Sequence, residues 1–177
     1  MEDPSTVFFS ADTRIEKDVK IQPNVYFGAG VIVKDNVLIK SFTHLENTIV
    51  NRNVMIGPFS RIRDNVEIGS GVYIGKNSKI EESTIIYPNV SIYHDIEIGS
   101  FCIIHSGSVL GSDGLGFAKE NGEWFKIEHL GKVILGTKVE LGANCSIDRG
   151  SVGNTLLGNN LLVHYFDPLQ QDPNLFD

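Results

Sequence analysis

The sequence is poor in several kinds of residue, and each shortage excludes a class of protein. Its 177 residues include 2 cysteines and 1 tryptophan, so a disulfide framework is implausible and a reducing compartment fits. No apolar run approaches the roughly 18 residues that a membrane-spanning helix needs. Lysine and arginine total 15 against 22 aspartates and glutamates, giving a net charge of −7, which argues against a surface built to follow nucleic-acid phosphates.

The length of the chain and its first residues indicate how many domains to expect and where the protein is located. At roughly 100–200 residues per domain, 177 residues predict one domain with a core of its own. The N-terminal Met-Glu-Asp-Pro lacks the basic and apolar regions of a signal peptide. We therefore expect a soluble cytoplasmic protein with no membrane insertion and no nucleic-acid partner.

Apolar residues recur every six positions, a period that belongs neither to a helix nor to an alternating strand. Small or β-branched residues follow four positions after each large one, and glycine often follows directly. After an interruption at about 115–132 the period returns. The large residues are Ile15, Ile21, Phe27, Val33, Ile39 and Leu45, then every sixth residue from Val50 to Leu110, then Leu135, Leu141, Ile147, Leu157 and Val163.

Short strands of two or three residues, each followed by a tight turn, describe a parallel β-helix in which three hexads make one triangular coil. The 22 hexads predict about seven coils. An ordinary β-sandwich would instead need longer strands with two-residue alternation. We expect an N-terminal cap at 1–14, an all-β solenoid at 15–163 with one excursion loop at 115–132, and an irregular tail at 164–177.

Hexads of this kind resemble the left-handed β-helix acyltransferases, and two families are visible. Residues 8–63 are similar to the start of the acetyltransferase domain of the bifunctional GlmU enzymes, which acetylate glucosamine 1-phosphate. The similarity lies in Phe-Phe-Ser-Ala-Asp-Thr (8–13), Pro-Asn-Val-Tyr-Phe-Gly (23–28), Ser-Phe-Thr-His-Leu-Glu (41–46) and Ile-Gly-Pro-Phe-Ser-Arg-Ile-Arg (56–63). In that family an arginine matching Arg63 holds the phosphate of the sugar nucleotide.

Residues from about 64 to 163 resemble instead the UDP-3-O-acylglucosamine N-acyltransferases of lipid A synthesis, the LpxD family. The motifs are Ile-Tyr-His-Asp-Ile-Glu-Ile-Gly (92–99), Gly-Ser-Asp-Gly-Leu-Gly-Phe-Ala (111–118), Gly-Glu-Trp-Phe-Lys-Ile (122–127) and Val-Glu-Leu-Gly-Ala-Asn-Cys-Ser-Ile-Asp-Arg-Gly (139–150). The resemblance implies a left-handed coil, a homotrimer, an acyl-carrier-protein thioester as donor and a UDP-amino-sugar acceptor.

The chain departs from both families where their catalytic base should be. In the LpxD family, Ile-Asp-Asn is followed by a histidine seven residues after the Asp; aligned here, these two positions are His164 and Gln171. The family's uridine-binding domain is not found in the chain. The catalytic histidine of the GlmU family lies beyond residue 64, where the similarity changes family.

Amide formation from a thioester needs a base, usually histidine, near the attacking nitrogen. His105 directly follows the inward Ile104 and is the candidate base. In the excursion loop, Trp124 and Lys126 offer an apolar wall and a cation for an acyl donor; the alternative is a loop folded over one face to cover apolar surface. Asp148 and Arg149 are expected to pair with each other or across a subunit boundary.

The residues predict no metal site, because no Cys/His cluster is present; Cys102 and Cys145 fall at inward positions and are expected to be buried, inert thiols. We expect no bound cofactor, with an acyl-carrier-protein thioester or acetyl-CoA as donor co-substrate. Three functions remain open: an LpxD-type N-acyltransferase, a non-catalytic remnant combining pieces of the two families, and a GlmU-like acetyltransferase that uses acetyl-CoA.

Overall fold

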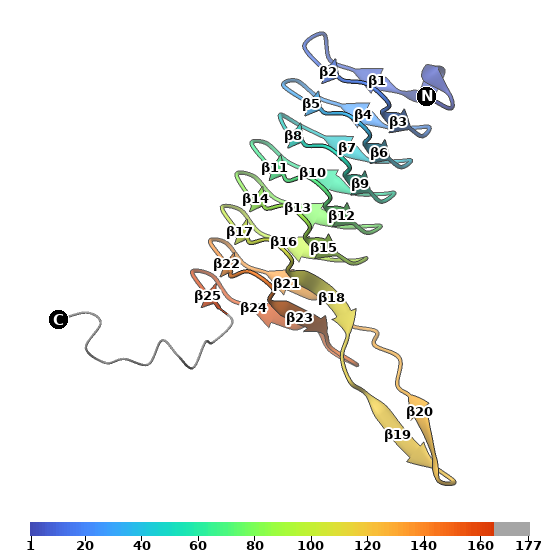
Figure 1. Cartoon of the computed structure of the whole chain (residues 1–177), viewed down its shortest axis with the longest axis vertical. Coiled ribbons are helices and arrows are strands. Elements are labelled where there is room, and N and C mark those ends of the chain that lie inside the picture. The colour runs from blue at the N-terminus through green and yellow to red at the C-terminus, as the bar shows by residue number, and fades with distance from the viewer. Residues whose placement is uncertain (165–177) are drawn as a thin grey trace, which may run out of the picture.

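In the computed structural model, which describes residues 1–164, the chain winds into a three-sided prism of short parallel strands (Figure 1). The three sides, here sheets A, B and C, contain eight, eight and seven strands. Each strand pairs with the strand one coil later, as Tyr73 and Ile74 pair with Ser91 and Ile92. The predicted β-helix is confirmed, with eight strands on two sides where about seven coils were expected.

The strands of the prism have the following bounds. Sheet A contains β1 (Phe8–Phe9), β4 (Tyr26–Phe27), β7 (His44–Leu45), β10 (Arg61–Ile62), β13 (Lys79–Ile80), β16 (Glu97–Ile98), β21 (Val133–Leu135) and β24 (Thr155–Leu157). Sheet B contains β2 (Arg14–Ile15), β5 (Ile32–Val33), β8 (Ile49–Val50), β11 (Glu67–Ile68), β14 (Ile85–Ile86), β17 (Ile103–Ile104), β22 (Glu140–Leu141) and β25 (Leu162–Val163). Sheet C contains β3 (Lys20–Ile21), β6 (Leu38–Ile39), β9 (Met55–Ile56), β12 (Tyr73–Ile74), β15 (Ser91–Ile92), β18 (Val109–Asp113) and β23 (Ser146–Arg149).

Both inward positions of each hexad fill the core. Ile62, Ile68 and Ile74 are completely buried, as are the smaller Val66 and Val90 four residues after a large aliphatic. Where the small position is Ser or Thr, its hydroxyl usually donates to a backbone carbonyl of the next coil, as Ser78 Oγ does to Tyr93 O at 3.1 Å. A buried hydroxyl thereby keeps a partner, which makes polar residues tolerable in this core. Thr13 is the exception, because its Oγ1 is buried without a partner among residues 1–164.

One extra strand comes from the segment expected to be an irregular cap. A 3₁₀ turn, η1 (Pro4–Thr6), is followed by β1, whose Phe9 stands six residues before Ile15 and stacks on Phe27 at 4.9 Å between ring centroids. The hexad period therefore begins one repeat earlier than predicted. The predicted tail is described only at His164, and its remainder lies outside the described residues.

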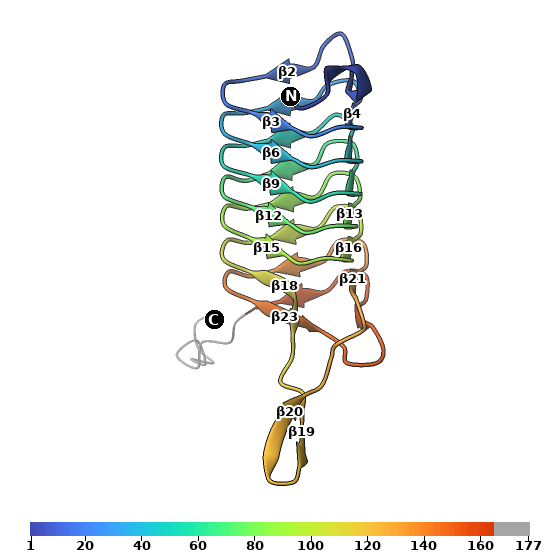
Figure 2. The ribbon, with the colours of Figure 1, turned by 90° about the vertical axis from the view of Figure 1, so that its right-hand side faces the viewer.

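The predicted excursion is a β-hairpin. The chain leaves the prism after Asp113, forms β19 (Phe117–Glu120) and β20 (Glu123–Lys126) as an antiparallel pair, and rejoins sheet A at Val133. Figures 1 and 2 show the hairpin extending past the last coils, along the long axis of the prism. Every residue of its two strands is exposed. The hairpin does not lie over a face of the prism, so the expectation of a covering loop is wrong for this part of the chain.

The cysteines behave as their positions predict. Both Cys102 and Cys145 are buried and free of disulfide bonds, and burial raises the pKa of the Cys102 thiol, which keeps it protonated and unreactive near neutral pH. As for membranes, residues 1–164 contain no helix that is long and apolar enough to cross one.

Candidate functional site

His105 lies at the end of β17, in a small polar cluster on the corner after sheet B. Its Nε2 is 3.0 Å from Glu140 Oε1 on β22, one coil further on. Its ring stacks on Tyr87 of the preceding coil, with centroids 4.9 Å apart and ring planes 10° from parallel. If the ring donates from Nε2 to Glu140, Nδ1 is left with the lone pair that can accept a proton.

Glycines open the surface on either side of this cluster. Tyr87 and His105 occupy the position after the buried aliphatic, and the neighbouring coils have Gly69 and Gly142 there. Beside Tyr87, a groove of about 370 Å³ runs over Gly69 and Glu67. On the other side, the His164 ring lies over Gly142. His105 is thus half-exposed, and Tyr87, which stacks on its ring, lines a shallow groove on sheet B.

Arg63 stands on a different corner, after sheet A. Its Nε lies 3.5 Å from Glu81 Oε2 in the next coil, and both side chains are partly exposed. Such a pair contributes little to stability. A ligand phosphate at Arg63 would have to compete with this carboxylate. No feature of the sequence indicated that Arg63 and Glu81 form a pair.

The hairpin separates its two predicted binding residues. The Trp124 side chain is 67% exposed, its ring lies 5.6 Å from Lys119 Nζ, and it shares an apolar surface with Leu115 and Phe117. Lys126, in contrast, contacts Asp113 through Nζ at the base of the hairpin. That contact lowers the pKa of Asp113 and raises the pKa of Lys126. Trp124 remains available to a ligand, while Lys126 is engaged within the chain.

Arg149 has a role that sequence reasoning missed. It does not pair with Asp148 within residues 1–164; it is only 4% exposed and donates from Nε to Gly111 O and from Nη2 to His94 O, both at 2.7 Å. Asp148 accepts instead from Ser112. These contacts tie β23 to the strand from which the hairpin leaves. The Ile-Asp-Arg-Gly motif drew attention to Asp148 and Arg149, but the sequence did not indicate which residues they contact.

The predicted site residues therefore do not converge within one chain. His105 lies on the corner after sheet B, Arg63 on the corner after sheet A, and Trp124 on the hairpin beyond the last coils (Figures 1 and 2). His105 with Glu140 offers a proton acceptor, Arg63 offers an anion contact, and Trp124 offers an apolar surface. Of these three positions, only His105 is a basic ring held by a carboxylate, and Tyr87, which stacks on it, lines a groove.

The prism defines a class of protein, the left-handed β-helices built from hexapeptide repeats. A family model described as "Bacterial transferase hexapeptide (six repeats)" matches residues 12–47, 47–81 and 77–112, which together are more than half of the chain. The chain belongs to this hexapeptide-repeat family. The resemblance read from the period is thereby confirmed.

Curated relatives share stretches of higher identity. The UDP-3-O-acylglucosamine N-acyltransferase of Marinomonas sp. (strain MWYL1) is 58% identical over 76 residues, which cover 43% of this chain and 22% of that protein. The protein of the same name from Polynucleobacter asymbioticus is 45% identical over 114 residues, covering 59% of this chain and 32% of that protein. The matched stretches thus span about a fifth to a third of these relatives.

Solved structures share the fold at low identity. UDP-N-acetylglucosamine O-acyltransferase from Moraxella catarrhalis superposes with a TM-score of 0.51 at 13% identity, over 78% of this chain and 65% of that chain. PerB from Caulobacter crescentus, solved in complex with CoA and GDP-perosamine, gives a TM-score of 0.50 at 15% identity, over 68% and 54%. At such identities the likeness shows the fold alone.

Proposed function

We propose that this chain is the β-helical part of an N-acyltransferase of the UDP-3-O-acylglucosamine type. It would transfer a hydroxyacyl chain from acyl carrier protein to the 2-amino group of the UDP-linked sugar in lipid A synthesis, in the cytoplasm. The observation that carries this proposal is the identity of 58% and 45% with proteins of that name. The motifs around the hairpin, Gly-Ser-Asp-Gly-Leu-Gly-Phe-Ala and Gly-Glu-Trp-Phe-Lys-Ile, support it.

The chemistry assigns a role to His105. The amine nitrogen attacks the thioester carbonyl carbon, a C–N bond forms and the C–S bond breaks. His105, oriented by Glu140 at 3.0 Å, takes the proton released by the amine and returns it to the departing thiolate. This balances the reaction without a further reactant. Gln171, aligned with the family's catalytic histidine, lies outside the described residues.

The remaining predicted residues take supporting roles in the proposal. Arg63 would bind a phosphate of the sugar nucleotide in place of Glu81, and Trp124 would line the acyl chain. Lys126, held by Asp113, would shape the hairpin more than contact the donor. Because these positions do not converge in one chain, the proposal requires that sites form between chains, as in a homotrimer.

The sequence leaves two alternative functions, a GlmU-like acetyltransferase and a non-catalytic scaffold. One experiment distinguishes both from the proposed reaction. The full chain is first sized by sedimentation equilibrium, and thiol release is then followed with acyl-carrier-protein and acetyl-CoA donors, with and without the amino-sugar acceptor. A trimer that releases thiol from acyl carrier protein only with the UDP-amino sugar supports the proposal. Release from acetyl-CoA with glucosamine 1-phosphate supports the GlmU-like alternative, and absence of release with every pair overturns the proposal in favour of a non-catalytic scaffold.

Histidine variants test the assignment of the base. His105→Asn should lower turnover at least 100-fold, because a positioned base contributes about 10²–10⁴-fold. His44→Asn is the matched control, since His44 also contacts a glutamate, Glu46, at 2.9 Å and a tyrosine ring, Tyr26, at 4.6 Å. Equal turnover of the wild type and the His105 variant would remove His105 from the mechanism while leaving the proposed reaction in place.

A further inference from the structure

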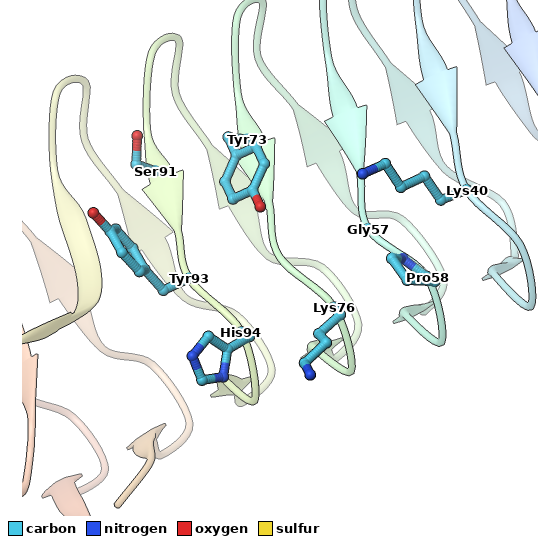
Figure 3. Close-up of a pocket in the computed structure, with 8 residues that line it drawn as sticks. All are labelled: Lys40, Gly57, Pro58, Tyr73, Lys76, Ser91, Tyr93 and His94. Carbon is cyan, nitrogen blue, oxygen red and sulfur yellow. The ribbon is translucent and has the colours of Figure 1, made fainter. Parts of the chain in front are cut away.

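Sheet C carries a trough that the proposed reaction does not use. It has a volume of about 620 Å³, within the range of small-molecule sites. Figure 3 shows it crossing several coils, with Lys40 at one end and Tyr93 at the other. Tyr73 and Ser91 stand on the sheet side, and Lys76 and His94 on the corner side.

Two glycines create this trough. The position after the buried aliphatic holds Lys40, Gly57, Gly75 and Tyr93 in four successive coils. A Cβ on Gly57 would lie 2.6 Å from the backbone carbon of Gly75, and a Cβ on Gly75 would lie 2.5 Å from that of Tyr93. No side chain therefore fits across two consecutive coils, and the floor between Lys40 and Tyr93 is bare backbone.

The trough is positively charged in an acidic chain. Its lining includes Lys40 and Lys76 but no carboxylate. Within residues 1–164 the lysines that form ion pairs are others, namely Lys34, Lys79, Lys126 and Lys132. The guanidinium of Arg149 lies behind His94, 3.3 Å from its Nδ1. Asp95 is the adjacent carboxylate; against the effect of burial, hydrogen bonds from Asn77 and His94 and the nearby charge of Lys76 lower its pKa. Two lysines around a hollow whose lining has no carboxylate attract anions.

The remaining residues that line the trough indicate which chemical group accompanies the anion in a ligand. Tyr73 and Tyr93 are each 43% exposed, so each presents part of a ring face and a phenolic hydroxyl. Ser91 adds a hydroxyl from β15. Lysine binds phosphate as a point charge, and tyrosine rings pack against flat or cyclic groups. The lining suits a ring and a phosphate side by side.

We propose that this trough binds a phosphorylated small molecule in which a ring adjoins one or two phosphates, with Lys40 and Lys76 holding the phosphates and the tyrosines holding the ring. The site lies on sheet C, whereas His105 and the groove beside Tyr87 lie on sheet B. The inference goes beyond the proposed acyl transfer and does not depend on it.

Calorimetric titration of the full chain at about 50 mM salt tests the proposal. The probes are adenosine diphosphate, inorganic pyrophosphate and adenosine, which separate the phosphates from the ring. We expect saturable binding of adenosine diphosphate, weaker binding of pyrophosphate and none of adenosine at the same concentrations. Binding of adenosine diphosphate should weaken at high salt. Absence of saturable adenosine diphosphate binding up to about 5 mM, where only a Kd well above 1 mM would escape detection, overturns the proposal.

A pair of double variants locates the binding. Lys40→Ala with Lys76→Ala should weaken adenosine diphosphate binding at least tenfold. Lys17→Ala with Lys20→Ala removes the same charge from exposed positions outside the trough and should change the affinity less than twofold. Far-ultraviolet circular dichroism verifies that both variants are folded. Equal weakening in both variants would mean nonspecific attraction of anions and would overturn the site.

Discussion

At the scale of single residues, glycine decides how closely neighbouring coils approach. At the position after the buried aliphatic, a Cβ on Gly75 would lie 2.5 Å from the Tyr93 carbonyl carbon, a distance that side chains essentially never adopt. At Gly158, the same position in the repeat, no atom of residues 1–164 lies within 4 Å of an added Cβ. Identical residues at equivalent places in the repeat therefore carry very different constraints.

Gly75→Ala should destabilise the fold by about 1–3 kcal/mol or more, because the added methyl group forces two backbones apart. Gly158→Ala is the matched control and should change stability by less than about 0.5 kcal/mol. Urea unfolding monitored by circular dichroism measures both. A midpoint for Gly75→Ala equal to that of the control would show that the coils separate at little cost.

At the scale of elements, the hairpin is held at its base, because its strands are exposed along their whole length. Arg149 fixes the strand that leads into it, and Lys126 contacts Asp113. The hydrogen bond and charge of Lys126 lower the pKa of Asp113. A carboxyl group with a lowered pKa stabilises the folded arrangement above its ordinary pKa, and that contribution disappears as the pH falls through the lowered value.

We therefore expect the hairpin base to loosen below about pH 3.8, the ordinary pKa of Asp113. Asp113→Asn should show faster amide exchange at the base of the hairpin already at pH 7, because the charge is absent. Hydrogen exchange of residues 114–127, with Asp18→Asn at an exposed position as control, measures the effect. Exchange that is equal in wild type and Asp113→Asn at pH 7 would assign the hairpin's position to Arg149 alone.

At the scale of the whole molecule, the prism is a one-dimensional stack in which each coil contacts its two neighbours. Stability in such a stack is a sum over coils and their interfaces. Ile74 in β12 is completely buried between neighbouring coils. Ile15 in β2 occupies the equivalent inward position but is only partly buried, because β2 pairs on one side with β5.

The loss of unfolding free energy caused by an isoleucine-to-alanine substitution should thus depend on the coil in which it is made. Ile74→Ala should destabilise by about 2–5 kcal/mol, the usual cost of deleting a fully buried aliphatic side chain, and Ile15→Ala by less than about 2 kcal/mol. Denaturant midpoints and slopes distinguish the two. Equal losses would mean that the stack unfolds without regard to position, contrary to a sum over local interfaces.

The six-residue period was sufficient to predict most of the strands of the prism and the residues that form its core. Each hexad has the same two inward positions, so Ile62, Ile68 and Ile74 could be assigned to the core without knowing which strands pair. The start of the first coil was missed because Phe9 follows another phenylalanine and stands before an irregular stretch. The excursion was recognised from the loss of the period, but its direction was not, since nothing local specifies it.

Only the tertiary structure decided which residues meet. His105 reaches Glu140 across 35 positions, and Arg149 reaches Gly111 across 38, because the hairpin is inserted into the coil that separates them. Lys40 and Tyr93 face one trough because the two coils between them carry glycine at the same position. A repeat specifies local geometry from local residues, whereas a site depends on side chains that stacking brings together from different coils.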